Sequence, residues 1–215
     1  MKILKNFCLA MLAGIMISIG GVVFVACVGM ESKIVGSIFF ALGLTVILMQ
    51  GYLLFTGKTA YVFENKPSYL GDLLLIWLGN LVGCILVGLC VYFALPNLSQ
   101  TANELCLKKM TQTPWQTIVL GALCGILVYI AVDYYKTHSD KHSIEKYLLV
   151  FTCVPIFIIC GFEHSVADMF YFAASSDLLL FTGQGICYIL LVSLGNLVGA
   201  IVFHSLRKFA QSKTK

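Results

Sequence analysis

The sequence predicts an all-α membrane protein with six transmembrane helices, arranged as two inverted three-helix repeats in which the second and fifth helices are broken. Three observations lead to this fold class. The mean hydropathy is +0.94, and 60% of the residues are hydrophobic while only 11% are charged. Uncharged runs long enough to cross a bilayer recur along the chain. The string LGNLVG occurs twice, starting at Leu78 and at Leu194.

Five helices are predicted from runs without charged residues, each longer than the roughly 20 residues that cross a bilayer as a helix. These runs are 6–30, 34–57, 73–103, 110–132 and 178–206. A sixth apolar segment starts near Tyr147 and is interrupted by Glu163, His164 and Asp168. The first run follows two lysines and so also resembles a secretory signal, but it is longer than a signal core of about 15 residues. A first membrane helix therefore fits better.

The basic residues predict which side of the membrane holds the two chain ends. With six spans both ends lie on one side, and of the 14 lysines and arginines only Lys33, Lys108 and Lys109 fall on the other side. The positive-inside rule therefore predicts a multi-pass protein with cytoplasmic termini. The net charge of +4 gives no reason to expect a nucleic-acid partner.

The repeated string explains why the two halves should be inverted. One copy lies in the third span and the other in the sixth, and two related units with an odd number of spans must face opposite ways. We expect the units to cover residues 7–95 and 113–206 of one membrane domain, 1–215. Each copy contains a G-x-x-x-G pair, which lets helices pack closely. We expect packing rather than substrate contact for Gly79, Asn80, Gly83, Gly195, Asn196 and Gly199.

Two segments interrupt the second and fifth spans at equivalent places. They are GYLLFTG, starting at Gly51, and GFEHSVA, starting at Gly161. Each begins with a glycine and an aromatic residue, and each then introduces polar residues into an apolar pattern. Paired interruptions of this kind predict discontinuous helices that line a substrate path.

The second interruption carries ionisable residues inside a membrane span. An aspartate at a bilayer centre costs on the order of 2.5–3.5 kcal/mol, so Glu163 and Asp168 are expected to face protein or water rather than lipid. His164 titrates near neutral pH and can give a proton or a hydrogen bond to a weak-acid anion, which lowers the cost of dehydrating that anion. A purely structural pairing of the glutamate and the histidine stays open as the alternative.

Neither a metal centre nor an enzyme is expected. The nine cysteines include no C-x-x-C pair, and His138 with His142 is expected to form a solvated turn. We predict no cofactor. Ser165 follows His164, but neighbouring helical residues point about 100° apart and no G-x-S-x-G string is present.

The strings GFEHSVADMFYF, LLFTGK and LGNLVG resemble the formate/nitrite transporter family of bacterial membrane channels, over nearly the whole chain from Phe7. The resemblance implies an aquaporin-like protomer with its own pore, assembled as a homopentamer in the bacterial inner membrane. It also implies a channel or transporter for small monovalent weak-acid anions such as formate, nitrite or hydrosulfide, with protons as possible partners. An aquaporin-like pore for neutral small solutes is the alternative.

The resemblance also assigns roles to individual residues. The family's central histidine falls on His164, the adjoining glutamate on Glu163, and the threonine of the broken second helix on Thr56. Lys109 lies where the family keeps an outward-facing lysine, which would concentrate anions at the pore mouth. Constrictions around a central chamber would be formed by Leu54 and Val128 inside, and by Phe40, Leu44 and Phe157 outside.

Three features depart from the family pattern. Gly125 and Asp168 stand where the family has asparagines, and only six residues precede Phe7, where the family has an amphipathic helix. These departures leave the specificity for formate or nitrite open, together with any N-terminal gate. The string GFEHSVADM resembles the hydrosulfide-channel branch more closely than the formate branch.

Overall fold

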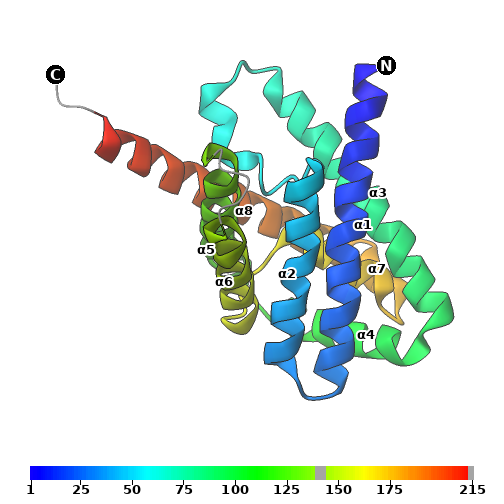
Figure 1. The fold of residues 1–215 in the computed structure, drawn as a ribbon. Helices are drawn as coiled ribbons and strands as arrows, with labels where there is room; N and C mark the ends of the chain where they lie inside the picture. Colours follow the sequence, from blue (N-terminus) through cyan, green and yellow to red (C-terminus); the bar gives the residue numbers. More distant parts are fainter. Residues whose placement is uncertain (139–143, 213–215) are drawn as a thin grey trace.

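A computed structural model describes residues 1–138 and 144–212, and within them every regular element is a helix (Figure 1). The all-α prediction is therefore confirmed. His142, Lys141, Lys213 and Lys215 lie outside the described residues. The α-helices are α1 (Lys2–Gly29), α2 (Lys33–Gln50), α3 (Tyr69–Ala94), α4 (Pro96–Met110), α5 (Pro114–Thr137), α6 (Glu145–Ile159), α7 (Ser165–Ala174) and α8 (Gln184–Gln211). Two short 3-10 helices are η1 (Thr59–Glu64) and η2 (Leu178–Phe181).

Five of the described helices are long and apolar enough to cross a membrane: α1, α2, α3, α5 and α8. They correspond to the five uncharged runs. The sixth apolar segment is divided between α6, which has 15 residues, and α7, which has 10. Both described chain ends lie toward the top of Figure 1, whereas α4 and the turn between α1 and α2 lie at the opposite end of the bundle.

Two of the helices, α2 and α3, are shorter than the uncharged runs that predicted them. The run 34–57 leaves helical geometry at Gly51, whose φ of 69° belongs to the left-handed region that favours glycine. The run 73–103 contains the end of α3 at Ala94 and the start of α4 at Pro96, because proline suits a first helical position. Cys106 is buried in α4.

The LGNLVG strings lie where long helices meet most closely. In α3, a Cβ added at Gly79 would lie 2.6 Å from the Cβ of Ala10 in α1. In α8, a Cβ at Gly199 would overlap the backbone oxygen of Ala122 in α5. Only glycine fits at such contacts, so each string holds its helix against the first helix of its half.

Candidate functional site

The first interruption begins directly after α2. Gly51 turns the chain, and the backbone N–H of Tyr52 donates to the Ile47 carbonyl at 3.0 Å. The next N–H, of Leu53, donates to the carbonyl of Leu9 in α1 at 3.2 Å. The segment that follows α2 is therefore hydrogen-bonded to the neighbouring helix α1.

The second interruption repeats this pattern after α6. Gly161 has φ 72°, and the N–H of Phe162 donates to the Phe157 carbonyl at 2.8 Å. The N–H of Glu163 donates to the carbonyl of Leu120 in α5 at 3.3 Å. The glycine, the turn and the tie to a long helix thus all recur.

Asn80, from the first LGNLVG string, completes the first interruption. Its Oδ1 accepts from the N–H of Phe55 at 2.8 Å. Its Nδ2 donates to the carbonyl of Leu53 at 2.9 Å and to that of Ala10 at 2.7 Å. One buried side chain therefore satisfies two backbone groups of the interruption that have no partner within a helix, and ties them to the carbonyl of Ala10 in α1.

Asn196, from the second string, does the same for the second interruption. Its Oδ1 accepts from the N–H of Ser165 at 3.0 Å, and its Nδ2 donates to the carbonyls of Glu163 and Gly121, both at 2.8 Å. Neither asparagine lines the two cavities described below. Their contacts position backbone.

The two interruptions meet through Thr56 and His164. The Nε2 of His164 lies 2.9 Å from the Oγ1 of Thr56, and its Nδ1 accepts from the N–H of Ala167 at 3.2 Å. Because Nδ1 accepts, the neutral imidazole carries its hydrogen on Nε2 and donates it to Thr56. Among the described residues the Thr56 hydroxyl has no further partner, so its own hydrogen is free to bind an acceptor. Both side chains are buried.

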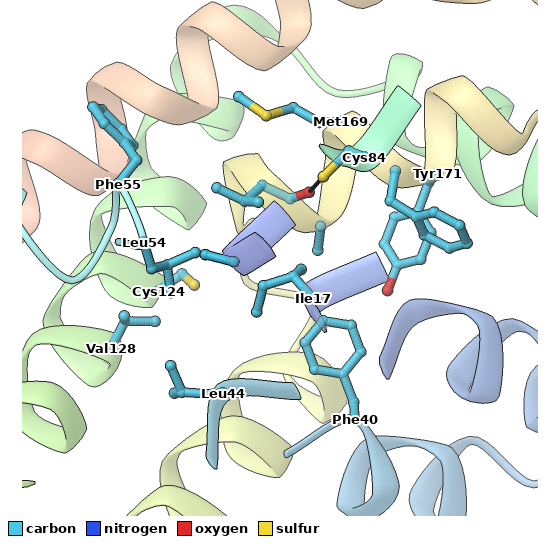
Figure 2. Close-up of a cluster of buried hydrophobic side chains, with 14 of the residues drawn as sticks. Ile17, Phe40, Leu44, Leu54, Phe55, Cys84, Cys124, Val128, Met169 and Tyr171 are labelled. Carbon is cyan, nitrogen blue, oxygen red and sulfur yellow. Dashed lines mark hydrogen bonds between the residues drawn. The ribbon is translucent and has the colours of Figure 1, made fainter. Parts of the chain in front are cut away.

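Apolar side chains surround this pair. The Phe157 ring stacks on the His164 ring with centroids 5.7 Å apart, and the Phe40 ring meets Phe157 edge-on at 6.4 Å. Figure 2 shows Phe40 in one buried cluster with Leu44 of α2, Leu54 of the first interruption and Val128 of α5. The residues predicted to form constrictions therefore come together, from four separate elements.

Two cavities approach this cluster from opposite ends of α2 and α6. The α5–α6 cavity, of about 390 Å³, is lined by Leu44 and Leu54 and by residues near the end of α2 and the start of α6. The α4 cavity, of about 310 Å³, is lined by Phe157 and His164 and by residues at the start of α2 and the end of α6. The two cavities share no lining residue, so the Thr56–His164 pair and its apolar neighbours separate them.

The α4 cavity contains a buried charge cluster. Lys109 pairs with Glu163, and its Nζ lies 3.0 Å from the Oδ1 of Asp168. Burial lowers the pKa of Lys109, but the carboxylates of Asp168 and Glu163 outweigh it and hold this pKa well above its ordinary 10.5. The lysine predicted to face outward therefore lines the α4 cavity, where its single positive charge meets two carboxylates.

Among the described residues, the Glu163 carboxylate makes no hydrogen bond to His164, the structural pairing that the sequence left open. Its carboxylate accepts from Lys109 and, at 2.8 Å, from the Nε2 of Gln112. Its side chain turns toward α4 because the cation lies there, and His164 is oriented by Ala167 and Thr56 instead. The sequence showed that Glu163 adjoins His164, but it did not predict the contacts of Glu163 with Lys109 and Gln112.

The α5–α6 cavity has the opposite character. Lys58, Lys136 and Lys146 line it, and no carboxylate is present among its described lining residues. Lys136 donates to the carbonyl of Gly57 at 3.1 Å, at the edge of the first interruption. This cavity therefore presents a positive surface to small anions.

Some site features were missed in the sequence. Gln112 follows α4 and bridges Glu163 to Tyr188 of α8, whose hydroxyl donates to the Gln112 Oε1 at 3.1 Å. Only its place three residues after Lys109 hinted at a role. Gly125, which departs from the family pattern, lines neither cavity: a Cβ there would lie 2.8 Å from the Cα of Asn196 in α8. An asparagine side chain has no room at this position.

These features define a helical, multi-pass membrane protein with a buried hydrogen-bonding pair between two cavities. The description "Formate/nitrite transporter" belongs to a family whose sequence model matches residues 1–210. The chain therefore belongs to the formate/nitrite transporter family, as the resemblance predicted.

Curated relatives agree with this assignment. The chain is 32% identical over 191 residues to the formate channel FocA of Escherichia coli (strain K12), which covers 78% of this chain and 65% of the relative. It is 33% identical over 184 residues to the nitrite transporter NirC of Salmonella typhimurium (strain LT2), covering 78% and 66%. The chain thus spans just under two thirds of the length of these relatives. They are a channel and a transporter, not enzymes.

Two solved structures have the same fold. One, described as an FNT family ion channel, superposes with a TM-score of 0.84 at 28% identity, over 97% of this chain and 90% of that one. The other, described as a pentameric formate channel with formate bound, gives a TM-score of 0.80 at 23% identity, over 97% of both chains.

Proposed function

We propose that the chain forms a channel for small monovalent weak-acid anions, with formate, nitrite and hydrosulfide as the candidate substrates. The observation that carries this proposal is the Thr56–His164 hydrogen bond, buried between cavities that approach it from opposite ends. The functions named for the relatives support the same class of substrate.

In the proposed mechanism the anion passes between two hydrogen-bond donors. It leaves water at the apolar cluster around Phe40 and Leu44, where losing its hydration is costly. The Nε2–H of His164 and the hydroxyl of Thr56 replace some of that hydration with charge-assisted hydrogen bonds. If a proton is transferred to the anion, it would come from the Nε2 of His164, because the Nδ1 of His164 accepts from the N–H of Ala167.

The two cavities have different parts in this mechanism. Lys58, Lys136 and Lys146 attract anions to the α5–α6 cavity. We assign this cavity to the cytoplasm, since the positive-inside rule puts the lysine-rich loops there. The α4 cavity then faces the outside of the bacterial inner membrane. Its charge is more nearly balanced, because Lys109 meets two carboxylates.

We further propose that residues 7–95 and 113–206 are inverted repeats and that the interruptions are their broken second and fifth helices. The paired glycines and the matching contacts of Asn80 and Asn196 support this. A homopentamer with one pore in each protomer is proposed from the structural relative described as pentameric. A monomeric mass in mild detergent would contradict it.

The function is tested by anion flux into proteoliposomes with His164→Phe. This variant keeps a ring that can stack on Phe157 but removes both nitrogens. We expect formate, nitrite or hydrosulfide flux to fall at least about tenfold, as the loss of one charge-assisted hydrogen bond predicts. The matched control is His204→Phe, because His204 lies outside both cavities. Equal flux in wild type and His164→Phe would refute the role of His164.

The same liposomes separate the proposal from a neutral-solute pore. Formate, nitrite, acetate and hydrosulfide are compared with glycerol across a range of pH. Anion flux that changes with pH supports the proposal. Flux of glycerol alone, without charge movement or pH dependence, would establish the neutral-solute pore instead.

A further inference from the structure

The charge cluster in the α4 cavity has more carboxylates than cations. Glu163 is 2% exposed and Asp168 1%, and both meet the single ammonium of Lys109. With all three groups ionised, the cluster would carry one uncompensated negative charge. Such a charge is expensive to bury, and two carboxylates at one site resist ionising together. The cheapest buried state of this cluster therefore contains one proton.

The hydrogen-bond partners indicate where that proton resides. Both oxygens of Glu163 are occupied, one by Lys109 and the other by Gln112. Asp168 meets Lys109 through Oδ1, while its buried Oδ2 has no partner among the described residues. Asp168 also lines the α4 cavity, as does His164. Its Oδ2 is thus the free acceptor of a proton from water in that cavity.

We propose that Glu163 and Asp168 share one exchangeable proton, held on Asp168, and that this proton determines whether an anion can approach His164 from the α4 cavity. This inference rests on the proposed function. With the proton bound, the cluster is neutral and its carboxyl group can donate a hydrogen bond to the anion. Without it, the cluster is negative and repels anions. Asp168 is therefore a specificity-determining residue that makes anion entry depend on pH.

Other ionisable groups face the cluster from the surrounding helices. They are Cys106 of α4, Cys124 of α5, His164 directly before α7, Tyr171 within α7, and Tyr188 of α8. Cysteine and tyrosine side chains are neutral at physiological pH, so they add no charge there. His164 can take a second proton only by losing its bond from Ala167. Asp168, whose Oδ2 has no partner among the described residues, is left as the group that takes up and releases the proton.

Two further lysines stand at the mouth of the same cavity. Lys33 and Lys108 are exposed lining residues, so solvent and salt screen their charges. They attract anions to the entrance whatever the state of the cluster. The buried cluster acts one step deeper, on entry to the His164 site.

A first experiment observes the proton without any transport. The infrared carbonyl stretch of a protonated carboxyl group is recorded for the purified full-length protein in detergent across pH. We expect this band at neutral pH in the wild type and its loss in Asp168→Asn. The matched control is Glu104→Gln, which removes an exposed carboxylate from the same helix as Lys109. A wild-type spectrum without this band, or a band unchanged in Asp168→Asn, overturns the inference.

A second experiment measures flux with equal pH on both sides, corrected for protein-free liposomes. We expect wild-type flux to fall as pH rises and the cluster loses its proton. Asp168→Asn and Glu163→Gln each leave one carboxylate with Lys109, so both should keep at least tenfold more flux than wild type at alkaline pH. Glu104→Gln should follow the wild type. If wild type and both neutralised variants show the same pH profile, the inference is wrong. If the wild type carries no anion at all, the proposed function fails, while the infrared result still decides the state of Asp168.

Discussion

The two interruptions have the same backbone scaffold but carry different chemistry. In the first, Asn80 holds the backbone of Leu53 and Phe55, and the next residue is the neutral Thr56. In the second, Asn196 holds the backbone of Glu163 and Ser165, around His164. The first interruption continues into η1, whereas the second starts the helix α7.

This difference separates what holds the site from what acts in it. The repeated string satisfies backbone groups in both halves, so it reports on architecture and not on substrate. The carboxylates beside the site occur only in the second half, where Glu163 and Asp168 meet Lys109 of α4. The first half contributes the hydroxyl of Thr56, and Lys58 in the lining of the α5–α6 cavity. The site therefore forms where the two interruptions meet, and these differ in chemistry although equivalent asparagines, Asn80 and Asn196, hold them.

The largest expected effect is a loss of stability when the asparagines that hold the two interruptions are replaced. Asn80→Ala and Asn196→Ala would each leave two backbone groups of an interruption unpaired and would also remove a contact to a helical carbonyl. At about 1–3 kcal/mol for each buried unpaired group, the unfolding free energy of both variants should fall by roughly 2–6 kcal/mol. Thermal unfolding in detergent measures this loss. A large loss for one variant and none for the other would break the equivalence of the two halves.

The next effect concerns the helix contacts beside those asparagines. A Cβ at Gly83 would overlap the backbone oxygen of Met11, and one at Gly199 that of Ala122. Gly83→Ala and Gly199→Ala should each lower the unfolding free energy by about 1–3 kcal/mol through overpacking. Gly71→Ala is the control on α3, since nothing lies within 4 Å of its added Cβ. A harmless Gly83→Ala would show that α1 and α3 do not need this approach.

A smaller effect tests the chemical contribution of the first interruption. Thr56→Val keeps the shape of the side chain but removes the hydroxyl opposite His164. We expect anion flux to fall roughly tenfold, as one lost hydrogen bond to a charged group predicts. Thr45→Val serves as control, because the Thr45 hydroxyl bonds the Ala41 carbonyl of its own helix. Equal flux in the two variants would leave the second half as the only source of chemistry.

The smallest effect lies where the first interruption continues into η1. Glu64 accepts from Lys208 at 2.7 Å and from His204 at 3.0 Å, and these bonds lower its pKa from the ordinary 4.5. Its contribution to stability is therefore present above 4.5 and disappears as pH falls through the lower folded-state value. The Glu64–Lys208 ion pair is exposed, so Glu64→Gln should lower the unfolding free energy by less than about 1 kcal/mol at neutral pH. The difference in melting temperature from wild type should vanish in acid.

Much of the fold could be predicted from sequence, because long uncharged runs indicate membrane helices. The limits of that signal are equally physical. The run 73–103 concealed the boundary between α3 and α4, since α4 begins with the uncharged residues Pro96 to Asn103. Lack of charge shows that a segment can be buried but not where a helix ends.

The site was predicted less completely than the fold. His164 was selected as an ionisable residue inside a membrane span and Thr56 by family resemblance, but their contact joins residues far apart in the chain. The pairing of Lys109 with Asp168 left no trace in the sequence, because it depends on how α4 folds back over α7. A charged residue in a membrane span implies a free-energy cost of burial. Only the three-dimensional arrangement shows which partners offset that cost.

The N–H of Ala167 that caps Nδ1 of His164 has a bioenergetic consequence. A histidine conducts protons along a chain when it accepts at one ring nitrogen and releases from the other. Here one nitrogen is committed to the backbone, so a proton must arrive and depart at Nε2. If the chain is the channel proposed above, this arrangement would keep its pore from acting as a proton wire. Many copies could then lie in one membrane without dissipating the proton gradient across it.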